Sequence, residues 1–145
     1  MGNNLGLDLQ IINASVNTNI ARKNSLSNRV INYSKNNLKG KTISLLGLTF
    51  KANTDDTRYS PSLNLVEELA KKNIKVNAYD PHGTDKFKYR IDPKALNFIK
   101  LYKNLDYKKI YDMIQQKIIV DFRKILIEQE MENIGFKYYY IGKKI

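Results

Sequence analysis

The chain contains no cysteine, no tryptophan and a single histidine. Without cysteine, these 145 residues can form no disulfide, no thiolate zinc site and no cysteine nucleophile. One histidine without partners makes neither a metal site nor a catalytic dyad, and His82, beside Asp80 and Pro81, is interpreted as part of a loop turn. The sequence therefore assigns no catalytic residue and no metal ligand.

Long apolar runs are also missing, since none approaches the ~20 residues that cross a bilayer. The first residues lack the basic patch and apolar core of a signal peptide. We therefore expect a cytoplasmic protein that does not bind membranes. The hydrophobic fraction of 42% and charged fraction of 27% are typical of one folded domain with its own hydrophobic core.

Acidic residues are scarce: 14 Asp and Glu stand against 25 Lys and Arg, which gives a net charge of +11. A basic chain can bind nucleic acid through its phosphates. However, 20 of the 25 cations are lysines, and they are scattered along the whole chain. This pattern favours a solvated lysine-rich surface over a nucleic-acid interface. A basic field would still attract a diphosphate ligand.

The glycine triplet of dinucleotide-binding folds is absent, yet the pattern predicts an α/β order. An apolar strand over residues 42–47 ends at a glycine, and Ser60-Pro61 starts a helix over residues 61–72 after a polar loop. A second strand over residues 75–79 then implies a right-handed βαβ unit with parallel strands. The carboxyl edge of such strands is where α/β proteins usually bind nucleotides.

In the remaining segments, the sequence pattern that indicates helices and strands is weaker. Residues 81–104 show little pattern and are interpreted as loop with at most one short helix. A helix, a strand, a helix ended by glycine and a final strand are expected over residues 107–115, 117–120, 128–133 and 136–141. The three tyrosines at 138–140 alternate faces of that last strand, which favours packing over base stacking.

An apolar stripe at three- and four-residue spacing marks the first part of the chain as one long helix or two broken helices. Its members are Leu9, Ile12, Val16, Ile20, Leu26, Val30 and Tyr33. Packing in the core of this domain is the favoured interpretation. The alternative is that the stripe packs on another domain or subunit.

Charged residues gather after the two predicted strands. Lys51 lies just past the first, with Asp55, Asp56 and Arg58 in the same loop. Lysine offers a mobile ammonium and arginine a planar fork to phosphate. The two adjacent carboxylates are interpreted as partners of the loop's backbone and cations rather than as an acid/base pair. In a parallel sheet, Arg123 would lie at the same edge as Lys51, although a structural salt bridge with Asp121 is an equal alternative.

At these residues the chain resembles a known family, the nucleotide-sugar dehydrogenases of the UDP-glucose 6-dehydrogenase kind. The segment from Leu46 to Pro61 resembles the start of their C-terminal UDP-binding domain, and residues 76–81, 120–123 and 135–142 match in the same order. Residues around Ala14, Val16 and Asn19 look like the end of the family's central, dimer-forming helical region. The resemblance covers most of the chain.

The resemblance implies an α/β fold in which residues 1–38 end the helical dimerisation domain and residues 39–145 form a Rossmann-like UDP-binding sheet. It implies that Phe50, Lys51 and Arg123 hold a UDP-sugar and that Arg58 reaches NAD on a facing domain. The family oxidises the C6 alcohol of the sugar twice with NAD. It uses a cysteine nucleophile with a lysine, an asparagine and an aspartate from earlier domains.

The chain also departs from this family. No NAD domain and no catalytic cysteine are encoded here. We therefore expect that this chain alone neither binds NAD nor catalyses the oxidation. Tyr59 replaces a glutamate, and a strand of the family is missing near Leu96 and Asn97, so the sheet is expected to be one strand short. We expect a truncated or split chain that forms a homodimer or works beside a separate chain with the NAD domain. The alternative is a non-catalytic dimerising module, or a decayed remnant without ligand.

Overall fold

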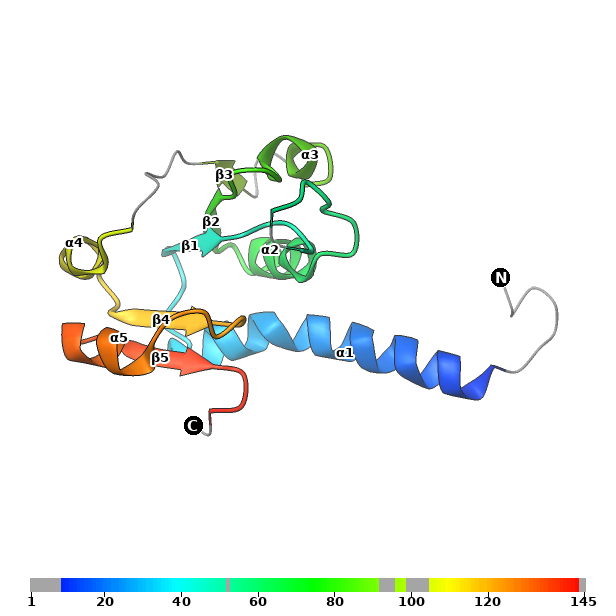
Figure 1. Cartoon of the computed structure of the whole chain (residues 1–145), viewed down its shortest axis with the longest axis horizontal. Coiled ribbons are helices and arrows are strands. Elements are labelled where there is room, and N and C mark those ends of the chain that lie inside the picture. The colour runs from blue at the N-terminus through cyan, green and yellow to red at the C-terminus, as the bar shows by residue number, and fades with distance from the viewer. Residues whose placement is uncertain (1–8, 52, 92–95, 99–104, 144–145) are drawn as a thin grey trace.

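In the computed structural model, residues 9–51, 53–91, 96–98 and 105–143 are described. The first element is one unbroken helix, α1, over Gln10–Tyr33. Ser25 and Ser27 do not interrupt it, because their hydroxyls donate to carbonyls of Arg22 and Asn24 within the same helix. Helix α1 extends well beyond the rest of the molecule (Figure 1).

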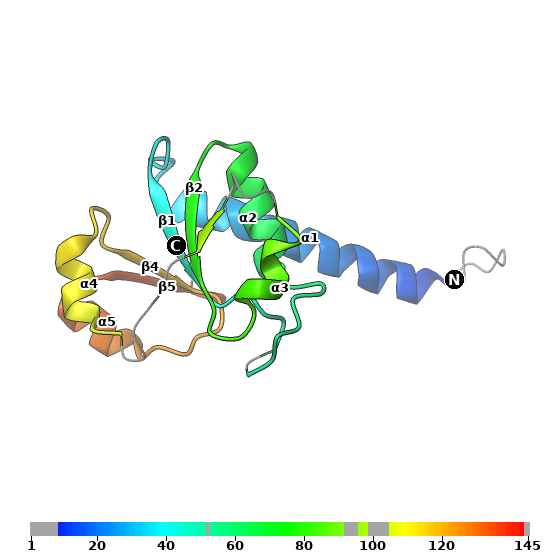
Figure 2. The same cartoon turned by 90° about the horizontal axis from the view of Figure 1, so that it is seen from above.

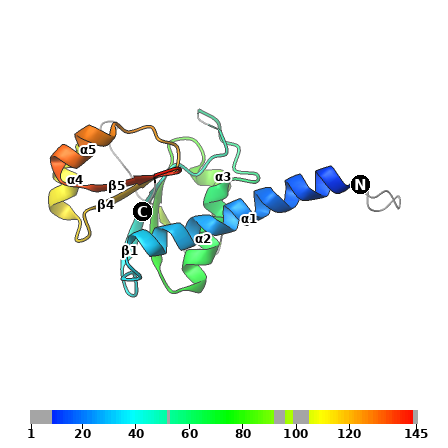
Figure 3. The same cartoon turned by 90° about the horizontal axis from the view of Figure 1, so that it is seen from below.

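The two halves of α1 have different surroundings. Leu26, Val30 and Tyr33 in its C-terminal half are buried. In its N-terminal half, however, Ile12 is 56% exposed and Val16 is 50% exposed. The prediction that the whole stripe packs in the core is therefore wrong for the first three turns. The helix simply continues past the surface that covers it, as the view from below shows (Figure 3).

The predicted βαβ unit is confirmed. Strand β1 (Thr42–Leu46) lies parallel to β2 (Lys75–Tyr79), with Ile43 opposite Val76, and α2 (Pro61–Lys71) connects them. The Ser60 hydroxyl accepts a hydrogen bond from the Ser62 N–H at 3.2 Å, so it caps α2 as the sequence indicated. The helix ends before Asn73, which takes the left-handed conformation with a φ of 57°.

The segment after β2 holds more structure than predicted. The short helix α3 (Thr84–Lys88) agrees with the interpretation, but β3 (Leu96–Phe98) lies where only loop was expected. Strand β3 pairs parallel to β2 and completes a three-stranded sheet in the order β1-β2-β3. Its three residues are too few to show an alternating pattern, so no strand signal is present in the sequence there.

The remaining elements are α4 (Tyr107–Met113), β4 (Ile118–Asp121), α5 (Glu128–Ile134) and β5 (Lys137–Tyr140). Strands β4 and β5 pair with each other in parallel and form a second sheet. Seen from above, this pair runs across the direction of β1 and β2 instead of continuing their sheet (Figure 2). The α/β class with parallel strands is confirmed, and its strands form two sheets.

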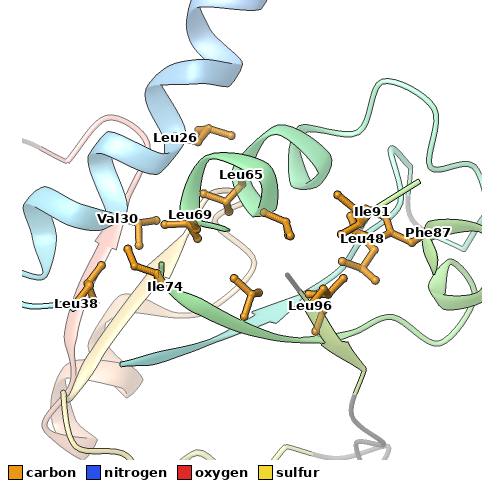
Figure 4. Packing of buried hydrophobic residues seen from close by; sticks show 13 residues of the cluster. Leu26, Val30, Leu38, Leu48, Leu65, Leu69, Ile74, Phe87, Ile91 and Leu96 are labelled. Carbon is orange, nitrogen blue, oxygen red and sulfur yellow. The ribbon is translucent and has the colours of Figure 1, made fainter. Parts of the chain in front are cut away.

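Each sheet has its own hydrophobic core. The first core joins the C-terminal half of α1, α2 and the three-stranded sheet, and Figure 4 shows Leu26 and Val30 near Leu65 and Leu69. The second is smaller and centres on Met131, Phe136 and Tyr138. The sequence predicted one hydrophobic core, whereas the structure has two.

Several contacts join the two parts. Phe122, just after β4, packs against the first core, and Tyr33 of α1 stacks on Tyr139 of β5 with ring centroids 4.2 Å apart. At the far end of the strands, the Gln116 side-chain amide donates to the Asn37 carbonyl at 2.9 Å. The stack confirms that this tyrosine run serves packing. Among the described helices, none is long and apolar enough to cross a bilayer.

Candidate functional site

The site is built on the turn that ends β1. Gly47 has a φ of 88°, which favours glycine, and a Cβ there would meet nothing. Its N–H donates to the Tyr79 carbonyl at 2.9 Å and so extends the pairing of β1 with β2. Its carbonyl accepts from the Ser62 hydroxyl at 3.0 Å. The turn is therefore tied to both β2 and the start of α2.

Asp80, directly after β2, organises the loop that follows this turn. One carboxylate oxygen accepts from the N–H groups of Leu48 and Thr49 at 2.7 and 3.2 Å. The other accepts from the N–H groups of His82 and Gly83 at 2.8 and 2.7 Å. Burial raises the pKa of this carboxyl, but the four backbone donors outweigh it and hold the pKa below its usual range. Asp80 thus fixes the loop after β1 and its own loop together.

Gly83 is required in this arrangement by close approach and not by its backbone angles. A Cβ at this position would lie 2.4 Å from the Cγ2 of Thr49 and 3.3 Å from the Cγ of Asp80. The absent side chain allows the turn after β2 to press against the loop after β1. The turn at His82 that the sequence suggested is therefore part of the site's frame.

The loop from Thr49 to Ser60 closes on itself. The Phe50 N–H donates to the Asp56 carbonyl at 2.7 Å, and the hydroxyls of Thr49 and Thr54 both donate to the Lys51 carbonyl, at 3.0 and 2.9 Å. With its backbone held in this way, Lys51 has an exposed side chain and Phe50 is 49% exposed. The loop is a fixed support that presents an ammonium group and an aromatic ring to solvent.

Asp121 at the end of β4 has a role like that of Asp80. It accepts from the N–H groups of Arg123, Ile125 and Leu126 at 3.0, 2.8 and 2.9 Å, and from the Tyr138 hydroxyl at 2.8 Å. Burial raises the pKa of the Asp121 carboxyl, but these donors lower it by more than burial raises it. The pKa of Asp121 therefore lies below its usual range. The pKa of Tyr138 is raised by burial and by donation to this carboxylate.

Arg123 leaves this turn and reaches the loop of β1. Its Nη2 donates to the Thr49 carbonyl at 2.9 Å. The structure thus brings the guanidinium to the loop that carries Phe50 and Lys51, as expected, although β4 lies in the second sheet and does not share an edge with β1. The salt bridge between Arg123 and Asp121 was the alternative, and Asp121 instead receives the Arg123 backbone N–H.

Arg58 has a different neighbourhood. Its Nε and Nη2 donate to the two carboxylate oxygens of Asp56 at 2.9 and 3.0 Å, and these bonds lower the pKa of Asp56 to about 2. Asp55 pairs with Lys86 of α3 at 2.6 Å and not with Lys51. These two ion pairs and Arg90 line a hollow of about 340 Å³. The interpretation of the aspartates as structural partners of cations is confirmed in geometry, with Lys86 as an unforeseen partner.

Sequence reasoning missed the frame of the site. Asp80 was noted only as the neighbour of a turn, Thr49 was given no role, and Tyr138 was assigned to packing alone. One signal was available: both aspartates stand at the carboxyl end of a strand, where a short acceptor can bind the N–H groups of the next turn. Among the described residues, no group of three or more His, Cys, Asp or Glu is placed to hold a metal.

The fold defines an α/β domain with parallel strands, and loops that carry cations follow the carboxyl ends of β1 and β4. Residues 44–101 match the model of the UDP-binding domain of the UDP-glucose/GDP-mannose dehydrogenase family. The predicted resemblance to this family is thereby confirmed.

Similar proteins support the same relationship. The chain is 34% identical to the UDP-glucose 6-dehydrogenase of Rickettsia conorii, over 96% of this chain and 37% of that protein. It is 30% identical to the UDP-N-acetyl-D-mannosamine dehydrogenase of Methanococcus vannielii, over 79% of this chain and 30% of the relative. The chain thus spans about a third of the length of these relatives.

Two solved structures agree with this fold. The UDP-glucose dehydrogenase of Pyrobaculum islandicum superimposes with a TM-score of 0.62 at 23% identity, over 82% of this chain and 26% of that one. The UDP-N-acetyl-mannosamine dehydrogenase Cap5O of S. aureus gives a TM-score of 0.51 at 27% identity, over 81% and 30%. These likenesses extend the α/β assignment to most of the chain.

Proposed function

We propose that this chain binds the UDP part of a UDP-sugar at the carboxyl edge of β1 and β4, as the UDP-binding part of a UDP-glucose 6-dehydrogenase. The single observation that carries the proposal is the bond from Arg123 to the Thr49 carbonyl, which joins a cation from β4 to the loop of Phe50 and Lys51. Cations from separate elements at one place stabilise a bound pyrophosphate, and this contact supports such an arrangement.

Each residue has a role that its chemistry allows. The Lys51 ammonium, on a backbone held by Thr49 and Thr54, pairs with a phosphate oxygen. Arg123 has further N–H donors beyond the one given to Thr49 and offers them to the same diphosphate. The half-exposed ring of Phe50 covers a face of the uracil or ribose. The net charge of +11 attracts the anion over a longer range.

Calorimetric titration of UDP and UDP-glucose into the chain tests this proposal. We expect UDP to bind and Lys51→Gln to weaken it about tenfold, the scale of one lost charge-assisted hydrogen bond. Lys75→Gln is the matched control, because Lys75 is an exposed lysine at the opposite end of β2. A folded protein that gives no heat at millimolar UDP, or equal losses for both variants, would contradict the assignment.

The proposed reaction is the NAD-dependent oxidation of the C6 alcohol of UDP-glucose to the acid, and this chain contributes only part of it. NAD, when bound, accepts the hydrides. These 145 residues contain no cysteine, so the nucleophile comes from outside them. What they supply is the anchoring of the nucleotide, and Arg58, held in a fixed direction by Asp56, is the residue we assign to the NAD contact. A chain that carries the NAD domain is one partner consistent with this role.

Self-association through α1 is the second part of the proposal. Ile12, Val16 and Ile20 repeat every four residues and are each about half exposed, so they form one apolar face of the helix. Residues 10–21 contain no charged side chain, so two copies of this face can meet without charge repulsion. We assign the face to a second copy of this chain.

Light scattering measures this directly. We expect a dimer, and we expect Val16→Asp to give a monomer because a carboxylate would be buried between apolar faces. Asn17→Asp, one position away on the same helix, adds the same charge beside the apolar face and serves as control. A monodisperse monomer of the unaltered chain would rule out self-association and leave the uridine site untouched.

A further inference from the structure

The outer edge of β1 is open. Among the described strands, β1 pairs with β2 alone. The carbonyl of Lys41 accepts a hydrogen bond from β2 at one end of this pairing, and the N–H of Gly47 donates to β2 at the other. Because the backbone groups of a strand alternate in direction, the odd-numbered residues of β1 bond to β2. The even-numbered residues direct their N–H and C=O groups to the open edge, and they are Thr42, Ser44 and Leu46.

Strand β4 offers a second open edge. It pairs with β5 alone within the described part of the chain, and it lies between β1 and β5 (Figures 1 and 3). The Lys117 carbonyl accepts from the Lys137 N–H of β5 at 2.7 Å. By the same alternation, Val120 directs its N–H and C=O groups away from β5. The open edge of β4 is therefore on the side of β1.

Side chains bridge these two strands at both ends, although β1 and β4 belong to different sheets. Just before the strands, the Lys41 ammonium donates to the Gln115 side chain at 3.0 Å, and just after them the Arg123 guanidinium donates to the Thr49 carbonyl at 2.9 Å. Bridges by such long side chains are those expected when about 10 Å, room for one further strand, separates two strands. A sheet also turns by roughly 20–25° from strand to strand, so two strands on either side of one strand position differ in direction, as Figure 2 shows. We call the space between β1 and β4 the slot.

The surroundings of the slot indicate which strand fits it. Ile43 and Leu45 are half-buried against the first core, whereas Thr42 and Ser44 on the opposite face of β1 are exposed. A fitting strand therefore alternates apolar side chains on one face with hydroxyl side chains on the other. At the amino-terminal end, Lys41 bonds to a neutral amide and forms no ion pair with any described residue. An acidic residue just before the strand would pair with this ammonium.

We propose that the slot binds an extended segment of another protein chain, parallel to β1 and β4. Its chemistry is an acidic residue followed by about five residues that alternate between apolar and hydroxyl side chains. Such a segment bonds to the backbone of Ser44 on one side and of Val120 on the other, so it joins the two sheets into one. A second copy of this chain fits less well, because each of its described strands already belongs to a sheet. The inference rests neither on UDP binding nor on self-association through α1.

Fluorescence anisotropy with the full chain tests the inference, with the labelled peptide GDVTVTVG as the probe and UDP present at saturation. We expect the peptide to bind. Methylation of the backbone nitrogens of its three valines removes the donors of one edge and should weaken binding at least tenfold. Replacement of the peptide's aspartate by asparagine, or Lys41→Gln in the chain, should each weaken it about fivefold. Lys137→Gln is the matched control, because Lys137 is an exposed lysine at the start of β5.

Hydrogen exchange locates the bound peptide. The N–H groups of Ser44 and Leu46 should gain protection, while those of Ile43 and Leu45, already bonded to β2, should change little. The inference is overturned if the folded chain does not bind the peptide at millimolar concentration, if the methylated peptide binds equally well, or if β1 gains no protection. It is also overturned if the peptide converts a dimer of the chain into a monomer, because a second copy would then occupy the slot. A chain that binds the peptide but not UDP supports this inference and contradicts only the proposed function.

Discussion

Asp80 and Asp121 invite comparison, because each is a buried aspartate at the carboxyl end of a strand and each accepts several backbone N–H groups. They differ in what they join. Asp80 binds two N–H groups from the loop after β1 and two from its own turn. Asp121 binds three N–H groups of its own turn and the Tyr138 hydroxyl of β5.

This difference shows how the candidate site is supported without a glycine-rich phosphate loop. Asp80 sets the position of one loop relative to another, so it controls the place of Phe50 and Lys51. Asp121 shapes a single turn, from which Arg123 then reaches Thr49. We infer that Asp80 supports both the stability and the site, while Asp121 mainly supports the second sheet.

Acid should have the largest effect, because it protonates both carboxylates at once. Each pKa lies below its ordinary value near 3.8 in the folded chain. The stabilisation from these groups is therefore complete above the unfolded pKa and is lost as the pH falls through the lower folded pKa. Urea unfolding followed from pH 6 down to pH 2 should show this loss. The loss should be smaller when both aspartates are replaced by asparagine, and an equal loss would contradict our reading.

Asp80→Asn should be the most damaging single change. The amide keeps one acceptor but turns an NH₂ group toward two buried N–H donors, so we expect a loss of about 3 kcal/mol in the free energy of unfolding. UDP affinity should fall as well, because the loop of Lys51 is released. Chemical denaturation and UDP titration measure the two effects, with the exposed Asp112→Asn as control. Unchanged UDP binding in a destabilised variant would remove Asp80 from the site.

Asp121→Asn tests the other side of the comparison. Its three backbone donors lie in one turn that can open toward solvent, so we expect a smaller loss of about 2 kcal/mol. The stability of β4, β5 and α5 should fall first, and hydrogen exchange of their amides should accelerate more than that of β1 and β2. If both sheets lose protection equally, the two parts of the chain unfold as one unit.

Gly83→Ala examines the close approach in the frame of Asp80 without changing any charge. The added methyl group would meet the Thr49 methyl at 2.4 Å, so the loop must shift. We expect a loss of about 1–2 kcal/mol, the usual range for overpacking. The companion variant Thr49→Ser removes the methyl group that is struck, and in that background the alanine should cost less. Additive losses would show that the clash is relieved elsewhere.

Tyr138→Phe should have the smallest effect. It removes only the hydroxyl that donates to Asp121, whose three backbone donors remain. We expect a loss of about 1 kcal/mol. The pKa of Asp121 should rise toward its ordinary value, which nuclear magnetic resonance of the carboxyl carbon can follow. Tyr139→Phe, on the neighbouring ring that stacks on Tyr33, provides a control that keeps the ring contact.

Local pattern predicted much of the fold. Helix α2 was found because Ser60-Pro61 is a local start signal, and α5 because Gly135, with a φ of 108°, ends it. Strand β3 was not found, since three residues carry no period. The division into two sheets also had no signal, because the strand pattern is the same whether β4 joins β1 or stands apart.

For the candidate site, the sequence indicated which cations belong to which loop. It could not supply the partners, since Asp55 and Lys86 are thirty-one positions apart and meet only through the packing of α3. The assignments of Phe50, Lys51, Arg58 and Arg123 to ligands, and the domain boundary at residue 38, stay predictions.

The sequence by itself determined the order of helices and strands, the direction of the βαβ unit and the resemblance to a nucleotide-sugar dehydrogenase domain. These features depend on neighbours along the chain, where spacing and turn chemistry act directly. The tertiary structure decided that half of α1 stays uncovered and that two aspartates hold the loops. It also decided that Arg123 reaches Thr49. Those features depend on distances between segments remote in sequence, which no local pattern encodes.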